Sequence, residues 1–300
     1  MEDKLYEMMD WAEIEAVVYS EENQPRNILG PHKTKDGIVI QGYFPDASQA
    51  SVKILSGDKT VPMVQEDESG YYAVLLPGAK IPEYRFVVTG PDGETEEFYD
   101  AYAFPSQLDE KAQKQFEAGI CYDVYEMLGA HPAVIDGVRG TCFAVWAPNA
   151  LRVSVVGDFN HWDGRVHQMH LHDSGIYELF IPGVGEGDLY KYEIKAKGGL
   201  VYLKADPYAN AAQLRPDNAS VAADLKKYRW EDEEWMKQRR KVQGDKTPLY
   251  VYEVHLGSWK KPEDEREFYN YREIAPMLAE YVKEMGYTHV ELMPVMEHPL

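Results

Sequence analysis

The feature that most constrains the fold of this chain is an internal repeat. Leu29-Gly30-Pro31-His32 returns as Leu128-Gly129-Ala130-His131, and Asp100-Ala101-Tyr102-Ala103 returns as Asp206-Pro207-Tyr208-Ala209. Further echoes lie between these two in the same order, and the offset grows only from 99 residues (29 to 128) to 106 (100 to 206). Short matches that keep their order over this length indicate two copies of one structural module.

Each copy has the pattern of short antiparallel strands. Val153 and Val155 alternate with Arg152 and Ser154, which is the two-residue period of a half-buried strand. Several such strands within about 90 residues predict an immunoglobulin-like β-sandwich. The predicted fold class is therefore mostly β, with two tandem sandwiches. A helical stripe ahead of the first copy is expected to pack against it, and consists of Leu5, Met9, Ala12, Ala16 and Tyr19.

A different pattern begins after Thr247-Pro248. Residues 249–256 have the character of a buried strand, residues 274–285 carry a helical apolar stripe that ends at Gly286, and residues 288–294 form a second strand. The strands of such a βαβ unit run parallel, with a right-handed crossover. A closed (β/α)8 barrel needs about 250 residues, so we expect the first βαβ unit of a barrel that is incomplete in this chain.

These patterns predict five segments. The N-terminal helix and first sandwich occupy 1–106, a linker 107–122, the second sandwich 123–228, a linker helix 229–247 and the start of the barrel 248–300. Within the second sandwich, Trp146 falls inside a strand and is expected in the core.

Net charge and cysteine content argue against several classes of partner and of structural site. The chain has 51 acidic and 31 basic residues, a net charge of −20, which repels phosphate backbones and anionic lipids and argues against nucleic-acid or membrane partners. Two cysteines are too few for a disulfide framework or a zinc cluster. The acidic N-terminus lacks the features of a secretory signal. We therefore expect a cytoplasmic protein without a cofactor.

Three stretches resemble a known family. Residues 252–259 (Tyr-Glu-Val-His-Leu-Gly-Ser-Trp) and 287–299 (Tyr-Thr-His-Val-Glu-Leu-Met-Pro-Val-Met-Glu-His-Pro) are similar to the start of the barrel in bacterial 1,4-α-glucan (glycogen) branching enzymes of glycoside hydrolase family 13. The second sandwich resembles a family 48 carbohydrate-binding module, through Phe143-Ala-Val-Trp-Ala-Pro148 and Gly157-Asp-Phe-Asn-His-Trp162. The first copy is similar to the extra N-terminal module of some branching enzymes.

The resemblance implies transglycosylation in glycogen biosynthesis. A segment of α-1,4-glucan is held as a covalent glycosyl ester and passed to a 6-hydroxyl, which needs a carboxylate nucleophile and an acid about 5 Å apart. In the family these acids lie on later barrel strands, and no matching motif occurs in this chain. We therefore expect no catalytic residue here and no activity of this segment alone. Its partner would be an α-glucan, glycogen or a maltooligosaccharide, with the oligomeric state left open.

Two other functions fit parts of the sequence. A trehalohydrolase or a debranching enzyme would share the single carbohydrate-binding module. A stand-alone carbohydrate-binding protein would need no catalysis, but it would have no reason to keep the apolar strands of the βαβ unit.

Three residues of the second sandwich are candidates for carbohydrate binding. Trp162 follows a strand in a loop, where its ring can stack on a glucose unit or merely pin the loop. Lys191 alternates with two tyrosines and points away from them, toward sugar hydroxyls or toward solvent. Asn218 is a candidate sugar-contacting amide or a turn former. The first copy has no aromatic residue where Trp162 stands in the second, which argues against sugar binding there.

Three residues beyond the barrel strands are candidates for the wall of an active site. His255 ends the first strand, and Glu297 and His298 follow the second, at the strand ends where such barrels build their sites. A structural ion pair or loop anchor explains them equally well. The histidines between residues 161 and 172 do not share one face, so no metal site is expected.

Overall fold

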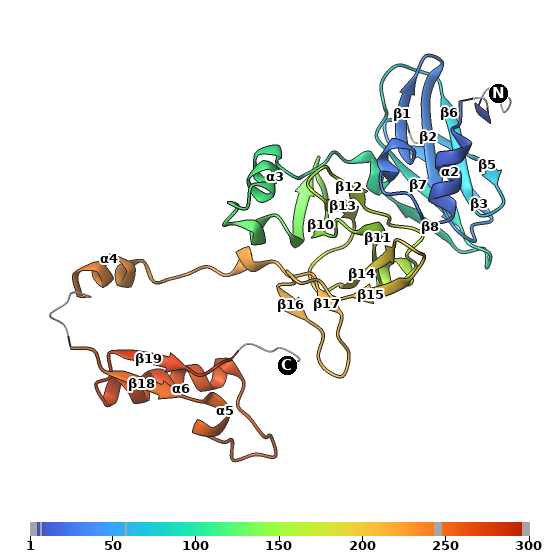
Figure 1. The fold of residues 1–300 in the computed structure, drawn as a ribbon. Coiled ribbons are helices and arrows are strands. Elements are labelled where there is room, and N and C mark those ends of the chain that lie inside the picture. The colour runs from blue at the N-terminus through green and yellow to red at the C-terminus, as the bar shows by residue number, and fades with distance from the viewer. Residues whose placement is uncertain (1–4, 7, 58, 243–247, 296–300) are drawn as a thin grey trace. The chain divides into compact units, whose positions relative to one another are not determined.

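The computed structural model describes all residues except 1–4, 7, 58, 243–247 and 296–300. The chain folds as two compact units, Met1–Lys227 and Tyr228–Leu300. The larger unit contains both copies of the repeat, and each copy is a pair of antiparallel sheets (Figure 1). The prediction of a mostly β chain with two tandem sandwiches is confirmed.

The first sandwich consists of two four-stranded sheets, in the orders β1-β2-β6-β5 and β4-β3-β7-β8. The apolar faces of β2, β3, β6 and β7 meet in its core, where Ile40 and Val52 are fully buried. The strands are β1 (Gly30–Thr34), β2 (Gly37–Tyr43), β3 (Gln49–Ile54), β4 (Lys59–Pro62), β5 (Val64–Asp67), β6 (Tyr71–Leu76), β7 (Tyr84–Thr89) and β8 (Thr95–Phe98).

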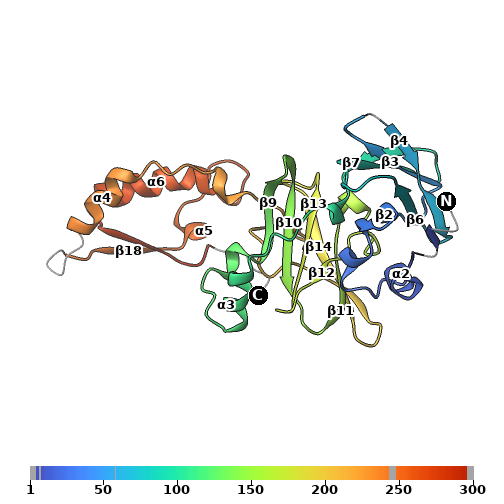
Figure 2. The ribbon, with the colours of Figure 1, turned by 90° about the horizontal axis from the view of Figure 1, so that it is seen from above.

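Helix α2 (Trp11–Val18) lies beside β2 and β6 (Figure 2). Asp10 begins it, because its side chain accepts a hydrogen bond from the backbone N–H of Ala12 at 3.1 Å. Ile14 and Val17 are buried against the strands, so the predicted packing of this helix on the first sandwich is confirmed. The helix is followed by η1 (Pro25–Asn27).

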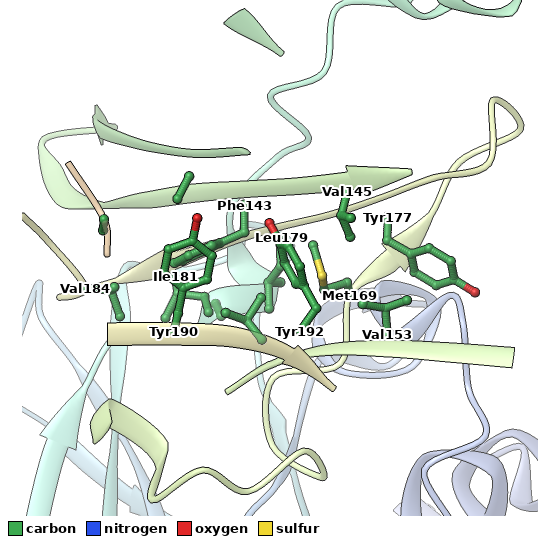
Figure 3. Packing of buried hydrophobic residues seen from close by; sticks show 14 residues of the cluster. Phe143, Val145, Val153, Met169, Tyr177, Leu179, Ile181, Val184, Tyr190 and Tyr192 are labelled. Carbon is green, nitrogen blue, oxygen red and sulfur yellow. The ribbon is translucent and has the colours of Figure 1, made fainter. Parts of the chain in front are cut away.

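The second sandwich pairs a sheet in the order β12-β13-β10-β9 with one in the order β11-β14-β17-β16, to which β15 adds at β14. Figure 3 shows how Phe143 and Leu179 from the first sheet meet Tyr190 and Tyr192 from the second, all of them fully buried or nearly so. The strands are β9 (Gly129–Ile135), β10 (Val138–Trp146), β11 (Ala150–Gly157), β12 (His170–Leu171), β13 (Ile176–Pro182), β14 (Leu189–Ala196), β15 (Val201–Lys204), β16 (Ala211–Ala212) and β17 (Ser220–Val221).

The glycine of the Leu-Gly-x-His echo has the same structural role in both copies. Gly30 and Gly129 adopt φ values of +93° and +109°, which residues other than glycine rarely adopt. A Cβ on Gly30 would lie 3.1 Å from the Tyr102 carbonyl oxygen, and one on Gly129 would lie 2.9 Å from that of Tyr208. The first and last echoes are therefore neighbours in space, which explains why they recur together.

A buried carboxylate accepts a hydrogen bond from a tyrosine hydroxyl at the equivalent place in each sandwich. Asp100 accepts a hydrogen bond from the Tyr84 hydroxyl at 2.5 Å, and Asp206 accepts one from the Tyr190 hydroxyl at 2.6 Å. Each carboxylate also accepts the N–H two residues later, at 2.8 Å, as a turn cap. Asp100 thereby begins η2 (Ala101–Ala103), which joins the first sandwich to the linker.

The segment between the sandwiches contains α3 (Glu110–Glu117), begun by Asp109, and η3 (Val124–Glu126). The expectation that Trp146 lies in the core is wrong, because its side chain is 54% exposed. Phe143 and Val145 occupy the core positions of β10, so that Trp146, at the strand's end, faces the other side. There its ring meets Phe116 of α3 at 5.9 Å in an edge-to-face contact.

The smaller unit contains the predicted βαβ arrangement. Strand β18 (Val251–Val254) pairs in parallel with β19 (His289–Leu292), and α6 (Tyr271–Glu284) lies between them in sequence. Asn270 and Glu273 cap the start of α6 reciprocally at 3.0 and 2.9 Å, and Gly286 follows its end at φ +76°. The other elements after Lys204 are η5 (Leu225–Lys227), α4 (Glu233–Val242) and α5 (Leu256–Trp259).

The two parallel strands leave apolar side chains uncovered. Val254 is buried, but Val251, Val290 and Leu292 are between 41% and 46% exposed. Parallel strands are normally covered on both faces and paired on both edges. Over the residues that the structure describes, no helix is both long and apolar enough to cross a membrane.

Candidate functional site

Trp162 lies on a loop of the second sandwich that we call the Trp162 loop, residues 158–169, between β11 and β12. It begins with η4 (Asp158–Asn160), and its last residues form backbone hydrogen bonds with β11. The N–H of Val155 donates to the His167 carbonyl at 3.0 Å, and the N–H of Met169 donates to the Val153 carbonyl at 2.8 Å. The loop is therefore a fixed part of the sheet surface.

Three residues of the Gly157-Asp-Phe-Asn-His-Trp162 motif have a local structural role. Gly157 has no space for a side chain, since a Cβ there would collide with the Leu189 carbonyl oxygen. Asn160 is buried; its Oδ1 accepts the N–H of Gly157 at 2.9 Å, and its Nδ2 donates to the Val155 carbonyl at 2.9 Å. Phe159 packs against the sandwich core. The motif thus specifies the conformation of the loop that carries Trp162.

The Trp162 ring is held at one edge. Its indole Nε1 donates to Asp158 Oδ1 at 2.8 Å, and its backbone N–H donates to the Gly157 carbonyl at 2.9 Å. The side chain is half-buried, and no other aromatic ring of the described residues stacks on it. Fixing an indole by its edge orients the exposed part of the ring for contact with a flat apolar surface, such as one side of a pyranose ring.

Lys191 and Asn218 lie together on the same sandwich. Lys191 is on β14 between two buried tyrosines, so its predicted outward direction is confirmed. Its Nζ donates to Asn218 Oδ1 at 2.6 Å, a contact between the two candidates that the sequence did not predict. Lys191 pairs in the sheet with Val156, one residue before Gly157, where the Trp162 loop begins.

The three candidates are therefore connected to the same end of one sheet. The backbone N–H of Trp162 donates to the Gly157 carbonyl, and Gly157 pairs on β14 with Tyr190, the residue before Lys191. An indole, an ammonium group and an amide offer one stacking surface together with donors and acceptors for hydroxyl groups.

The remaining candidates belong to the smaller unit. His255 is exposed and caps α5, with its Nδ1 2.8 Å from Ser258 Oγ and its carbonyl accepting the N–H of Trp259 at 3.0 Å. Glu297 and His298 lie outside the described residues. His255 at the end of a parallel strand is compatible with a pocket wall, a role that stays a prediction.

The histidines near the Trp162 loop have other partners. Burial lowers the pKa of His167 to about 4, and its Nδ1 lies 2.9 Å from Asn160 Nδ2. His172 Nε2 lies 3.0 Å from the buried Glu178 carboxylate. Among the described residues, no group of three or more His, Cys, Asp or Glu side chains is placed to hold a metal ion.

Residues that support the Trp162 loop were not recognised from the sequence. Arg152 is almost completely buried although it alternates with valines on β11, and Gln168 is fully buried within the loop itself. The available signal was a single charged residue in a strand whose other residues are apolar or small, since a buried arginine needs buried partners.

Two family models match the larger unit. Residues 10–102 match the N-terminal domain of the alpha-1,4-glucan branching enzyme GlgB, and residues 127–209 match carbohydrate-binding module 48, the isoamylase N-terminal domain. The 1,4-alpha-glucan branching enzymes GlgB of Rubrobacter xylanophilus and Gloeobacter violaceus are 46% and 47% identical over 287 and 294 residues. These matches cover 95% and 96% of this chain.

The chain is similar to bacterial branching enzymes over almost its whole length. It spans about two fifths of the length of these relatives, since the matches cover 39% of each. The resemblance that the 157–162 and 252–299 stretches indicated is confirmed. Among solved structures, a pullulanase from Anoxybacillus sp. LM18-11 complexed with maltotriose covers 89% of the chain and 39% of its own length, at a TM-score of 0.42 and 18% identity.

Proposed function

We propose that this chain is the N-terminal part of a glycogen branching enzyme, in which the second sandwich binds α-glucan for a barrel that begins near residue 248. The observation that carries this proposal is the order of the parts. A branching-enzyme N-terminal domain, a carbohydrate-binding module and a parallel βαβ unit follow one another, and the relatives match across all three. The five segments predicted from the sequence are the division that we propose.

The exposed apolar strands of the smaller unit support a continuing barrel. Val251, Val290 and Leu292 would be buried by further strands and helices of a (β/α)8 domain. In this proposal the carboxylates that cleave and transfer the glucan lie on those further strands. The reaction is a retaining transfer of an α-1,4-linked segment to a 6-hydroxyl.

The proposed partner is a linear α-glucan segment, in glycogen or in a maltooligosaccharide. Its helical conformation presents apolar sugar faces and rows of hydroxyl groups, to which Trp162 and the Lys191–Asn218 pair are matched. The net charge of −20 does not oppose a neutral polymer. The proposed compartment is the cytoplasm.

Replacing Trp162 by alanine tests the binding surface. The loss of one stacking platform should weaken glycogen binding about fivefold to tenfold, since a buried aromatic contact contributes roughly 1 kcal/mol or somewhat more. Affinity electrophoresis of the whole chain through gels containing increasing glycogen measures the dissociation constant.

The matched control is Trp146→Ala, which removes an exposed tryptophan from another strand of the same sandwich. It should bind glycogen as the unmodified chain does. Equal retardation of the unmodified chain and Trp162→Ala would contradict the assignment of Trp162, and weakened binding of Trp146→Ala alone would place the surface on β10.

A further inference from the structure

The Trp162 loop holds a backbone conformation that needs support. His161 and Trp162 have φ values of +54° and +60°, the left-handed region that residues with side chains rarely occupy. Two such residues in succession persist only where surrounding contacts over-determine the chain. Part of that support comes from within the motif, and the rest comes from the first sandwich.

The first sandwich reaches the loop through Tyr102. This residue lies in η2, and its one hydroxyl hydrogen is shared between the carbonyl oxygens of Val166 and Gln168, which lie 3.2 and 3.0 Å from the hydroxyl oxygen. Gln168 in turn donates from Nε2 to the Val17 carbonyl at 3.0 Å, at the end of α2. The Trp162 loop is thus hydrogen-bonded to η2 through Tyr102 and to helix α2 through Val17.

Arg152 makes a second connection from the same helix end. Its Nε donates to the Ser20 carbonyl at 3.3 Å, and its Nη1 donates to Ser154 Oγ at 2.8 Å. The Ser154 hydroxyl then donates to the carbonyl of Gly164 in the loop at 2.6 Å. A residue near the C-terminus of α2 is thus joined to the loop through two buried side chains.

A third contact lies at the surface. Arg165 of the loop forms an ion pair with Asp46 of the first sandwich at 3.1 Å, and a closer one with its loop neighbour Asp163 at 2.7 Å. Exposed pairs of this kind contribute little energy but restrict where the two groups lie. All three contacts converge on residues 164–168, directly after Trp162.

We propose that the first sandwich is a positioning element for the glucan-binding loop of the second. It contacts no sugar, and Tyr102 and its partners fix the conformation in which Trp162 is presented. This accounts for a first copy that keeps the fold of a carbohydrate-binding module without an aromatic residue at the corresponding place. The inference rests on the proposed function, since it assumes that Trp162 binds glucan.

The test compares Tyr102→Phe with Tyr208→Phe in the whole chain. Tyr208 is the equivalent residue of the second copy, and its hydroxyl makes no hydrogen bond among the described residues. Tyr102→Phe removes only the donor to the loop and should weaken glycogen binding roughly threefold to tenfold. Tyr208→Phe should leave the dissociation constant for glycogen unchanged.

A double-mutant cycle separates positioning from general stability. In the Trp162→Ala background, Tyr102→Phe should cause no further loss of glycogen affinity, because the residue that it positions is gone. Hydrogen exchange of the amides in residues 158–169 should be faster in Tyr102→Phe than in Tyr208→Phe. Asp46→Asn, a surface change that tolerates the left-handed backbone of Asp46, should weaken binding about twofold.

The outcomes distinguish the two proposals. If Trp162→Ala weakens binding but Tyr102→Phe and Asp46→Asn do not, the positioning role is overturned and the glucan site stands. An equal loss from Tyr102→Phe with and without Trp162 also overturns it. Unchanged affinity of Trp162→Ala overturns the proposed site, and the positioning role with it.

Discussion

Replacing Arg152 by alanine should lower the free energy of unfolding of the larger unit by about 3 to 5 kcal/mol. Its guanidinium is nearly inaccessible and pairs with Glu193 Oε1 at 2.8 Å, besides its bonds to Ser20 and Ser154. Removing one partner of a buried pair leaves the other charge without compensation, and costs this much. The effect should be among the largest of any single polar substitution, because the same side chain also joins the two sandwiches.

Urea denaturation followed by circular dichroism measures this loss. Arg139→Ala is the matched control, since Arg139 is an exposed arginine on β10, in the other sheet of the same sandwich, and its removal should change stability by less than about 0.5 kcal/mol. Similar values for the two variants would show that the contact between the sandwiches contributes little, and would weaken the case that they act as one unit.

The buried carboxylate of Asp100 should make stability depend on pH in an identifiable direction. Burial raises its pKa from 3.8 to about 6, although hydrogen bonds from Tyr84 and Tyr102 and the charge of Arg26 act the other way. A raised pKa means that the folded protein binds this proton more tightly than the unfolded chain. The resulting stabilisation is present below about pH 4 and is lost as the pH rises through about 6.

Asparagine at this position cannot lose a proton. Relative to Asp100→Asn, the unmodified chain should therefore lose about 2 kcal/mol of stability between pH 4 and pH 8. The change is measured by urea denaturation at the two pH values, with each midpoint converted to a free energy of unfolding by one common m-value. Asp136→Asn, in an exposed turn, should follow the unmodified chain within about 0.5 kcal/mol at both pH values. A constant difference between Asp100→Asn and the unmodified chain would contradict the raised pKa.

Patterns that depend on local chemistry were predictable from the sequence. The repeat and the helix–glycine boundary at Gly286 each follow from neighbouring residues, and the parallel pairing of β18 with β19 follows from the helical connection between them. The two-residue alternation of β11 identified a strand, but the prediction that it is half-buried is wrong, because Arg152 and Ser154 are buried as well as the valines. The N-terminal stripe was predicted as one helical run, but Leu5 and Tyr6 are helical separately and Asp10 begins α2.

Contacts between distant segments were not predictable. Trp146 was assigned to the core by its place in a strand, whereas its alternation with Phe143 and Val145 puts it on the other face; its contact there with Phe116 of α3 joins segments far apart in the sequence. The pairing of Lys191 with Asn218 joins residues 27 positions apart, across a turn whose geometry the sequence did not specify. Tyr102 and Gln168 are ordinary residues in the sequence, and their roles arise only because the two sandwiches meet.

The most direct test of the account asks what the purified chain does to an α-glucan. Amylose is incubated with the preparation that is retarded in glycogen gels, and α-1,6 linkages are counted by proton nuclear magnetic resonance from their anomeric signal. The account predicts no linkages above those of a buffer control, since the transferring carboxylates are proposed to lie on further barrel strands. New branch points formed by residues 1–300 alone would contradict it.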